Sequence, residues 1–172
     1  MRAAPALAGV ATPEVAVRRV DTAAEQVFEV RASGTVKASP AAVWKVLTNY
    51  EAMPDYVPDL QMTRVMSRSG NHAVVEQAGV ARFLFMRRTI HLIVNITEEP
   101  ISSIDIELVR GDMKVYRCRW EITPILETGG THIAYAGKLV PKFYVPGVLG
   151  ADIVRADIER MMKAVLGRLD EP

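Results

Sequence analysis

The chain has 172 residues, of which 49% are apolar, and its formal net charge is +1. This length suits one domain with one sizeable core, and the apolar content excludes an intrinsically disordered chain. A net charge so close to zero provides no overall field that would attract nucleic acid. The single cysteine excludes both an intramolecular disulfide and a cysteine-rich zinc site.

The N-terminal residues differ in composition from the rest of the chain. MRAAPALAGVAT combines Arg2 with small and apolar residues. It fits either a remnant of a secretory signal that ends near Ala11 or a disordered, alanine-rich tail. We therefore expect residues 1–13 to be such a tail or remnant and residues 14–172 to form a single domain. A signal remnant would indicate a periplasmic or secreted protein, and the cytoplasm is the alternative compartment.

Two strands and a helix are predicted first along the chain. Apolar and polar residues alternate over residues 14–20 and 27–37, which indicates a hairpin around the polar turn between them. Ser39 and Pro40 then provide an N-cap residue and a proline at the first helical position, so a helix is expected to run to about Asn49. Pro54 and Pro58 interrupt the next segment, and residues 50–57 are expected to form a short helix or a turn.

The remaining chain predicts six strands and one long helix. The strands are expected at residues 60–67, 73–79, 89–97, 101–109, 114–125 and 131–140, separated by turns rich in Gly, Asn and Pro. One apolar and one polar face per strand is typical of an antiparallel sheet with one buried face. The helix begins near Pro146 and Gly147, and its apolar stripe comprises Val154, Ile158, Met161, Val165 and Leu169. The predicted class is therefore α+β: a curved antiparallel sheet around a long C-terminal helix, with two short helices after the first strands.

Large side chains share one face of the predicted strand at residues 114–125. Tyr116, Cys118 and Trp120 alternate with charged residues that point the other way. A curved sheet that grips one helix usually encloses a cavity, and this one would have walls suited to an apolar small molecule. The residues expected to line it are Tyr116, Cys118, Trp120 and Tyr135 from the sheet, with Met161 and Val165 from the helix.

Several separated motifs carry a family resemblance. They are ASPAAVWKVLTNYEAMPDYVPDL at residues 38–60, GDMK at residues 111–114, and then Trp120, Pro124, Tyr135, Pro141 and Pro146. In this order they resemble the START-like helix-grip superfamily (SRPBCC), and within it the polyketide cyclase/dehydrase and coenzyme-Q-binding branch. The resemblance spans residues 25–170 and implies a deep cavity between sheet and C-terminal helix that holds a lipid, an isoprenoid quinone or a polyketide-like molecule. It does not imply catalysis, because the superfamily contains binders and transporters as well as enzymes.

No motif for catalysis or metal binding is present. GxSxG, HExxH and glycine-rich phosphate loops are missing, and the three histidines have no ligand spacing. No catalytic residue, metal ligand or cofactor is therefore predicted, and Cys118 is expected to be a buried small side chain. The alternative function is a cyclase or dehydratase acting on an aromatic or polyketide-like substrate. It requires acid–base groups inside the cavity, for which Glu76, His72 and Tyr135 are the candidates.

Two segments have the composition of a membrane or partner contact. Residues 82–88, RFLFMRR, mix aromatic and basic side chains, and residues 143–149, FYVPGVL, are apolar. The named candidates are Arg82, Phe83, Phe85, Arg87, Arg88, Phe143 and Tyr144. A strand with a solvated basic edge explains the first segment as well, and presentation of this segment to a protein partner is a third hypothesis for the function.

Overall fold

The computed structural model describes residues 12–83, 86–145, 147 and 150–171. Their elements, in chain order, are β1 (Glu14–Arg19), β2 (Phe28–Val36), α1 (Pro40–Leu47), the 3-10 helix η1 (Tyr50–Asp55), β3 (Leu60–Ser69), β4 (His72–Phe83), β5 (Met86–Glu99), β6 (Ser103–Gly111), β7 (Met113–Pro124), β8 (Thr131–Pro141) and α2 (Gly150–Asp170). Each predicted element is found, with its ends shifted by a few residues.

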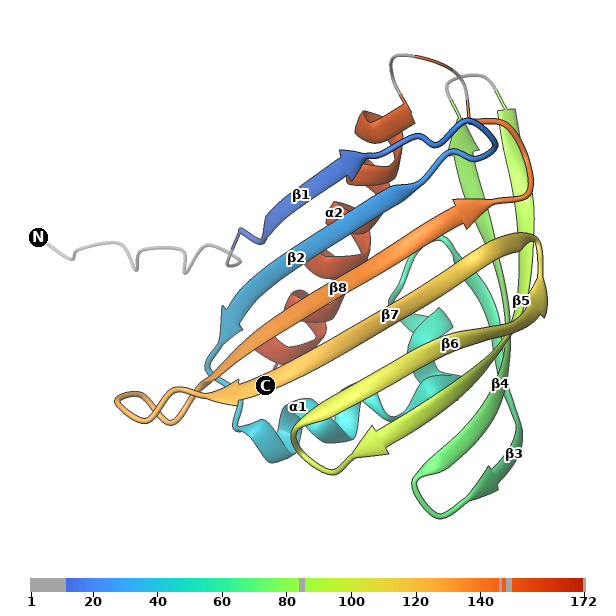
Figure 1. Cartoon of the computed structure of the whole chain (residues 1–172). Coiled ribbons are helices and arrows are strands. Elements are labelled where there is room, and N and C mark those ends of the chain that lie inside the picture. Colours follow the sequence, from blue (N-terminus) through green and yellow to red (C-terminus); the bar gives the residue numbers. More distant parts are fainter. Residues whose placement is uncertain (1–11, 84–85, 146, 148–149, 172) are drawn as a thin grey trace, which may run out of the picture.

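The strands form one eight-stranded sheet in the order β1-β2-β8-β7-β6-β5-β4-β3. All neighbouring strands are antiparallel. The sheet curves around α2 without closing, as Figure 1 shows, and α1 contacts both β7 and α2. This is the predicted curved sheet around one C-terminal helix.

The helix α1 begins as the sequence predicts. The Ser39 Oγ accepts a hydrogen bond from the Ala42 backbone N–H at 3.3 Å, and Pro40 occupies the first helical position. Val43 and Leu47 are the buried residues of its inner face. The helix ends at Leu47, and the Oγ1 of its C-cap residue Thr48 donates to the carbonyl of Trp44 at 2.7 Å. The helix η1 follows, with Pro54 inside it.

The β4–β5 hairpin is longer than predicted. The two strands pair from His72 opposite Thr97 to Phe83 opposite Met86. Gly79, where the prediction ended the first strand, lies within β4 instead. Its missing Cβ leaves room for the backbone carbonyl of Asp59, which would lie 2.7 Å from such an atom. That carbonyl also accepts from the backbone N–H of Val80 at 2.8 Å, so the glycine marks a close approach of two backbone segments.

The helix α2 packs closely against β2. A Cβ on Gly34 would lie 2.7 Å from the Cδ1 of Leu166, so the glycine lets the helix approach the strand. The buried residues of α2 include Ile158, Met162, Val165, Leu166 and Leu169. The apolar stripe predicted from the sequence included Met161 but not Met162. Met162 is fully buried and Met161 only partly, because the apolar surface of the helix is wider than a single row.

The two faces of β7 are those predicted. Cys118, Trp120 and Ile122 are buried. On the other face the Arg119 guanidinium pairs with Asp105 at 2.7 Å and with Glu121 at 2.9 Å. The Trp120 ring stacks at a tilt on Tyr135, with 4.7 Å between the ring centroids.

Trp120→Ala should lower the free energy of unfolding by about 3–5 kcal/mol, because it removes a large buried ring and leaves a cavity. Chemical denaturation of the variant and the parent measures the difference. Leu126→Ala is the control, since Leu126 is 88% exposed and its loss should change stability little. Equal stability of the Trp120 variant and the parent would contradict the assigned packing.

Candidate ligand-binding site

Three adjoining compartments lie between the inner face of the sheet and α2. Their volumes are about 240, 170 and 220 Å³. The first lies against the η1–β3 connection and β4, the second against Phe28 and the segment that precedes α2, and the third against Trp120 and Tyr135. Apolar side chains make up most of each wall. Another hollow, of about 570 Å³, lies on the outer face of the sheet, where Glu14, Arg31, Arg119 and Glu121 are among its lining residues.

The three compartments meet at two polar residues. Tyr116 on β7 and Asp157 on α2 line all three, one from the sheet side and one from the helix side. Gln77 on β4 and Met161 on α2 line the first and third compartments. The polar groups of the cavity are thus concentrated where its parts join, and its ends are apolar.

Four of the six predicted lining residues do line the cavity. Tyr116 and Met161 line several compartments, and Trp120 and Tyr135 line the third. Cys118 and Val165 are buried, at 2% and 0% exposure, but do not form part of these walls. They belong to the packed core that supports the cavity.

Sequence reasoning missed three polar lining residues, Gln77, Asp157 and Asp59. A signal for the first two was present. Gln77 follows Ala73 and Val75 at a spacing of two, and so occupies the apolar face of its strand. Asp157 lies one turn before Met161 and directly before Ile158, at the border of the apolar stripe. Asp59 lies in a connection, where side-chain direction cannot be read from a periodic pattern.

A cluster of two phenols and a thiol, Tyr116, Tyr135 and Cys118, lies at the wall of the third compartment. The Tyr135 hydroxyl donates to the Sγ of Cys118 at 2.9 Å. Gly137 makes room for this sulfur, which would lie 2.9 Å from a Cβ at that position. Burial raises the pKa of the Cys118 thiol to about 11, and it also raises the pKa of Tyr135. The negative charge that Cys118 acquires only at high pH is the main cause that raises the pKa of Tyr116, with burial second. These groups are therefore protonated near neutral pH, and Cys118 is not an activated nucleophile.

Four charged residues from three parts of the chain meet at the edge of the cavity. We call Asp59, Arg82, Asp157 and Arg160 the mouth cluster. The Asp59 carboxylate pairs with Arg82 on β4 and with Arg160 on α2, each at 3.0 Å. Arg160 also pairs with Asp157. The cluster therefore ties α2 to the η1–β3 connection and to β4 beside the first compartment.

The Asp157 carboxyl titrates at an unusual pH. Its pKa is raised to about 6, chiefly by burial and also by nearby Asp59, while Arg160 and Arg82 oppose the shift. Above this pH the cavity has a charged carboxylate in its wall. Below it, the same group is a neutral hydrogen-bond donor.

Glu76 and His72, the candidate acid–base groups, lie on the outer face of the sheet, so the expectation that they point inward is wrong. Glu76 pairs there with His91 and Arg64, each at 3.0 Å, and the Thr97 hydroxyl contacts the His72 ring at 3.2 Å. The physical reason is strand alternation. Because Val75 and Gln77 face inward, Glu76 between them must face outward.

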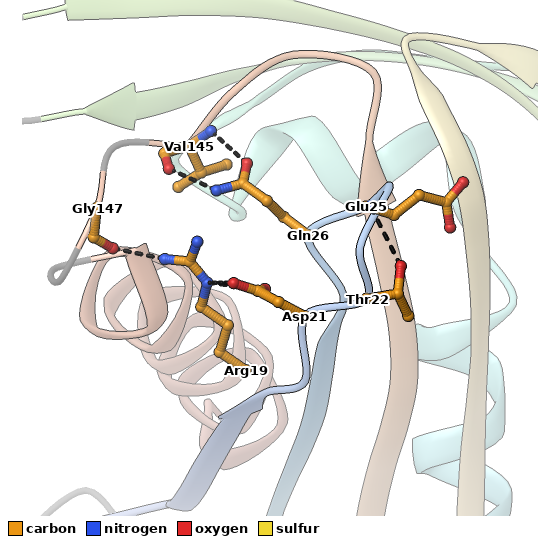
Figure 2. A network of polar contacts seen from close by, with 7 residues as sticks. All are labelled: Arg19, Asp21, Thr22, Glu25, Gln26, Val145 and Gly147. Carbon is orange, nitrogen blue, oxygen red and sulfur yellow. Dashed lines mark hydrogen bonds and ion pairs between the residues drawn. The ribbon is translucent and has the colours of Figure 1, made fainter.

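The end of the cavity beside Phe28 is fastened by the turn between β1 and β2. The Gln26 side chain donates to the carbonyl of Val145 at 2.9 Å and accepts from its backbone N–H at 2.8 Å (Figure 2). Arg19 donates to the carbonyl of Gly147 and pairs with Asp21 at 2.9 Å. Val145 is buried and lines the second compartment. The N-terminal hairpin thus holds the segment that leads into α2.

The predicted membrane or partner residues lie near this end as well. Arg82, Arg87 and Arg88 are exposed residues of β4 and β5, and the Arg88 guanidinium lies 4.5 Å from the centre of the Phe143 ring. Phe143 lines the second compartment, and Tyr144 is 72% exposed. Phe85 and the side chain of Phe83 lie outside the described residues.

Within the described ranges there is no group of three His, Cys, Asp or Glu side chains placed to hold a metal ion. None of the helices described is long and apolar enough to cross a membrane.

Comparison with solved structures places this fold among START-like proteins. It matches a START superfamily protein from Mycobacterium smegmatis with a TM-score of 0.69 and 19% identity, over 82% of this chain and 96% of that one. A STAR-related lipid transfer protein fragment from Xanthomonas axonopodis gives 0.68 and 18%, over 90% and 99%. The Zhui aromatase/cyclase from Streptomyces sp. R1128 gives 0.68 and 16%, over 83% and 93%. At these identities the likeness shows the fold.

The family follows from the sequence model that matches the chain. Residues 36–166 match the family described as polyketide cyclase / dehydrase and lipid transport, and the chain belongs to this family. No curated protein has detectable sequence similarity to it.

Asp157→Asn should stabilise the protein relative to the parent more at about pH 7 than at about pH 4. The folded protein keeps the Asp157 proton up to a pKa of about 6, whereas the unfolded chain loses it near the ordinary value of about 3.9. The parent therefore loses stability as the pH rises between these values, and the asparagine variant does not. Chemical denaturation across this range measures the difference. Asp152→Asn, an exposed change in the first turn of the same helix, is the control. Parallel pH profiles for Asp157→Asn and the parent would contradict the shift.

Proposed function

We propose that the protein binds an apolar small molecule in the cavity between the sheet and α2, with lipids, isoprenoid quinones and polyketide-like compounds as the candidate classes. The observation that carries the proposal is the set of three adjoining apolar compartments. An apolar cavity of about 150 Å³ takes up benzene, and typical ligand sites have about 300–1,000 Å³. Each compartment is thus large enough for a ring, and together they reach the size of a ligand site.

Binding would be driven by removal of apolar ligand surface from water, at about 25 cal/mol per Å² before ordering costs. Tyr116, Trp120, Tyr135 and Met161 would contact the ligand directly, and Cys118 and Val165 would support the wall from behind. Four of these residues are in or beside the tilted ring pair and the phenol–thiol cluster, which fix their side chains. A rigid apolar wall lowers the ordering cost of binding.

Native mass spectrometry of the purified protein, followed by organic extraction, tests this proposal. We expect a bound apolar species, or uptake of an added one, and we expect Ala81→Phe to abolish it. Ala81 lines the first and second compartments, so the added ring would fill them. Ala136→Phe is the matched control, because Ala136 is exposed on the outer face of β8. Uptake that is equal in both folded variants would overturn the proposed site.

A cyclase or dehydratase is the second candidate function. One observation favours it. Asp157, a carboxyl group with a pKa of about 6, and Tyr116, which has a phenol hydroxyl, line the same space. A base and a hydrogen-bond donor on opposite sides of a substrate are what proton abstraction beside a carbonyl requires. A dehydratase would release a product lighter by one water than its substrate. A carrier would return its ligand unchanged in the same extraction.

We further propose peripheral contact with an anionic membrane at the end of the cavity near Phe143. Exposed Arg87 and Arg88, together with exposed Tyr144, support it, since basic and aromatic side chains side by side fit anionic headgroups. Arg87→Glu should weaken cosedimentation with vesicles of anionic phospholipid. Loss of one basic residue should lower the favourable free energy of membrane binding by about 1 kcal/mol, and the added negative charge should lower it further. Arg117→Glu, on the outer face of β7, is the control. Cosedimentation that is unaffected by the Arg87 change, or equally weakened by the control, would remove this contact.

A further inference from the structure

The mouth cluster has its two signs of charge on different sides. Asp59 and Asp157 line the cavity compartments, and their side chains are 19% and 30% exposed. Arg82 and Arg160 line none of the three compartments, and their side chains are 52% and 40% exposed. The carboxylates therefore face the ligand space, and the guanidinium groups extend toward solvent.

From this arrangement we infer that Asp157 accepts a hydrogen bond from the ligand, which is therefore an uncharged apolar molecule with a hydroxyl-type donor rather than an anionic amphiphile such as a fatty acid. The inference rests on the proposed function and deepens it. It assigns a polar subsite at the point where all three compartments meet, with the apolar parts of the ligand extending from there.

The chemistry of Asp157 explains why a neutral hydrogen-bond donor would be preferred over an anion. An ionised carboxylate can only accept hydrogen bonds, and it has about four lone-pair positions. Its only ion-pair partner among the described residues is Arg160, on its own helix. Asp59 and Arg82 act on it from the η1–β3 connection and from β4, and Tyr116 faces the same space from β7. The raised pKa indicates that these neighbours do not fully offset its burial.

A donor on the ligand would complete this set of partners. Hydrogen bonds to charged groups contribute about 1.5–3 kcal/mol, against about 0.5–1.5 for neutral pairs. An anionic headgroup at the same place would instead meet two carboxylates in a space with apolar walls, where like charges are strongly unfavourable.

Gln77 extends the subsite on the sheet side. Its side chain lines the first and third compartments together with Tyr116 and Asp157. Within the described part of the chain this side chain makes no hydrogen bond, so its amide is free to bind a ligand oxygen. A ligand hydroxyl could donate to Asp157 and accept from Gln77 at once.

Three probes with the same ring system test the inference on the full chain: 2-naphthol, which is an uncharged donor, 2-methoxynaphthalene, which has no donor, and 2-naphthoate, which is an anion. Their affinities are measured by fluorescence titration at about pH 7.5, where Asp157 is ionised. We expect 2-naphthol to bind about tenfold more tightly than 2-methoxynaphthalene, and 2-naphthoate to bind most weakly. Equal affinities for the first two probes, or a preference for 2-naphthoate, would overturn the inference.

The variant Asp157→Asn tests whether Asp157 causes the preference for 2-naphthol. The variant should lose most of the preference for 2-naphthol and should bind 2-naphthoate more tightly than the parent does, whereas Asp152→Asn should match the parent. Lowering the pH to about 5 should raise the affinity of the parent for 2-naphthoate, because Asp157 takes up a proton near pH 6. An unchanged order of affinities in the folded Asp157 variant would contradict the role of Asp157.

The same titrations separate the two proposals. If none of the probes binds, or if Ala81→Phe leaves all three affinities unchanged, the cavity is not a ligand site and the proposed function fails. If the probes bind and Ala81→Phe blocks them, but Asp157→Asn has no selective effect, the proposed function stands and only this inference fails.

Discussion

One constraint shapes this molecule: α2, a helix of 21 residues, is the main cover for the inner face of an eight-stranded sheet, with the short α1 and η1 on β7 and β3. The helix cannot lie against every strand, and it packs mainly on β1 and β2. Gly34 allows the closest approach on β2, where the Leu166 side chain takes the place of a Cβ. The inner faces of the strands on the other side of the curve are left partly uncovered by the helix. Most of the cavity lies in that space, so it is a consequence of the size of the helix relative to the sheet.

Polar contacts fasten the elements that enclose this space. At one edge, the mouth cluster joins α2 to β4 and to the η1–β3 connection through the Asp59 carboxylate. At another, the side chain of Gln26 pairs with both backbone groups of Val145 (Figure 2). Two attachments of this kind position a helix that has few strands to pack on. They also supply charged and hydrogen-bonding groups beside an apolar cavity, which is where a ligand's polar group would be recognised.

The first strand, β1, has a role in this arrangement that the resemblance to the family did not provide. The strand β1 lies at one edge of the sheet, and α2 packs against it. Arg19, the last residue of β1, reaches the carbonyl of Gly147. The family model begins at residue 36, so β1, the turn after it and nearly all of β2 precede the matched region. In this protein they complete the wall at the start of α2.

The sequence by itself determined the elements, their order and the faces of the strands. Alternation on β7 placed Cys118 and Trp120 inside and Arg117 and Arg119 outside, because successive strand residues must point to opposite sides of a sheet. The motifs at residues 38–60 and 111–114 identified the family. Strand alternation and the family motifs together predicted most of the apolar residues that line the cavity.

Only the tertiary structure decided how the polar residues are used. Asp157 and Arg160 are three positions apart on one helix, but Asp59 is 101 positions from Arg160, and no local pattern relates Asp59 and Arg82 to the helical pair. Their pairing depends on how α2 crosses the sheet, which periodicity does not specify. The same holds for Asp157, whose raised pKa arises from burial and from neighbours on other elements. The outward position of Glu76 could be derived from alternation, but its partner His91 comes from the register of β4 against β5. Local patterns fix which face a residue occupies, and the packing of distant segments fixes which groups meet there.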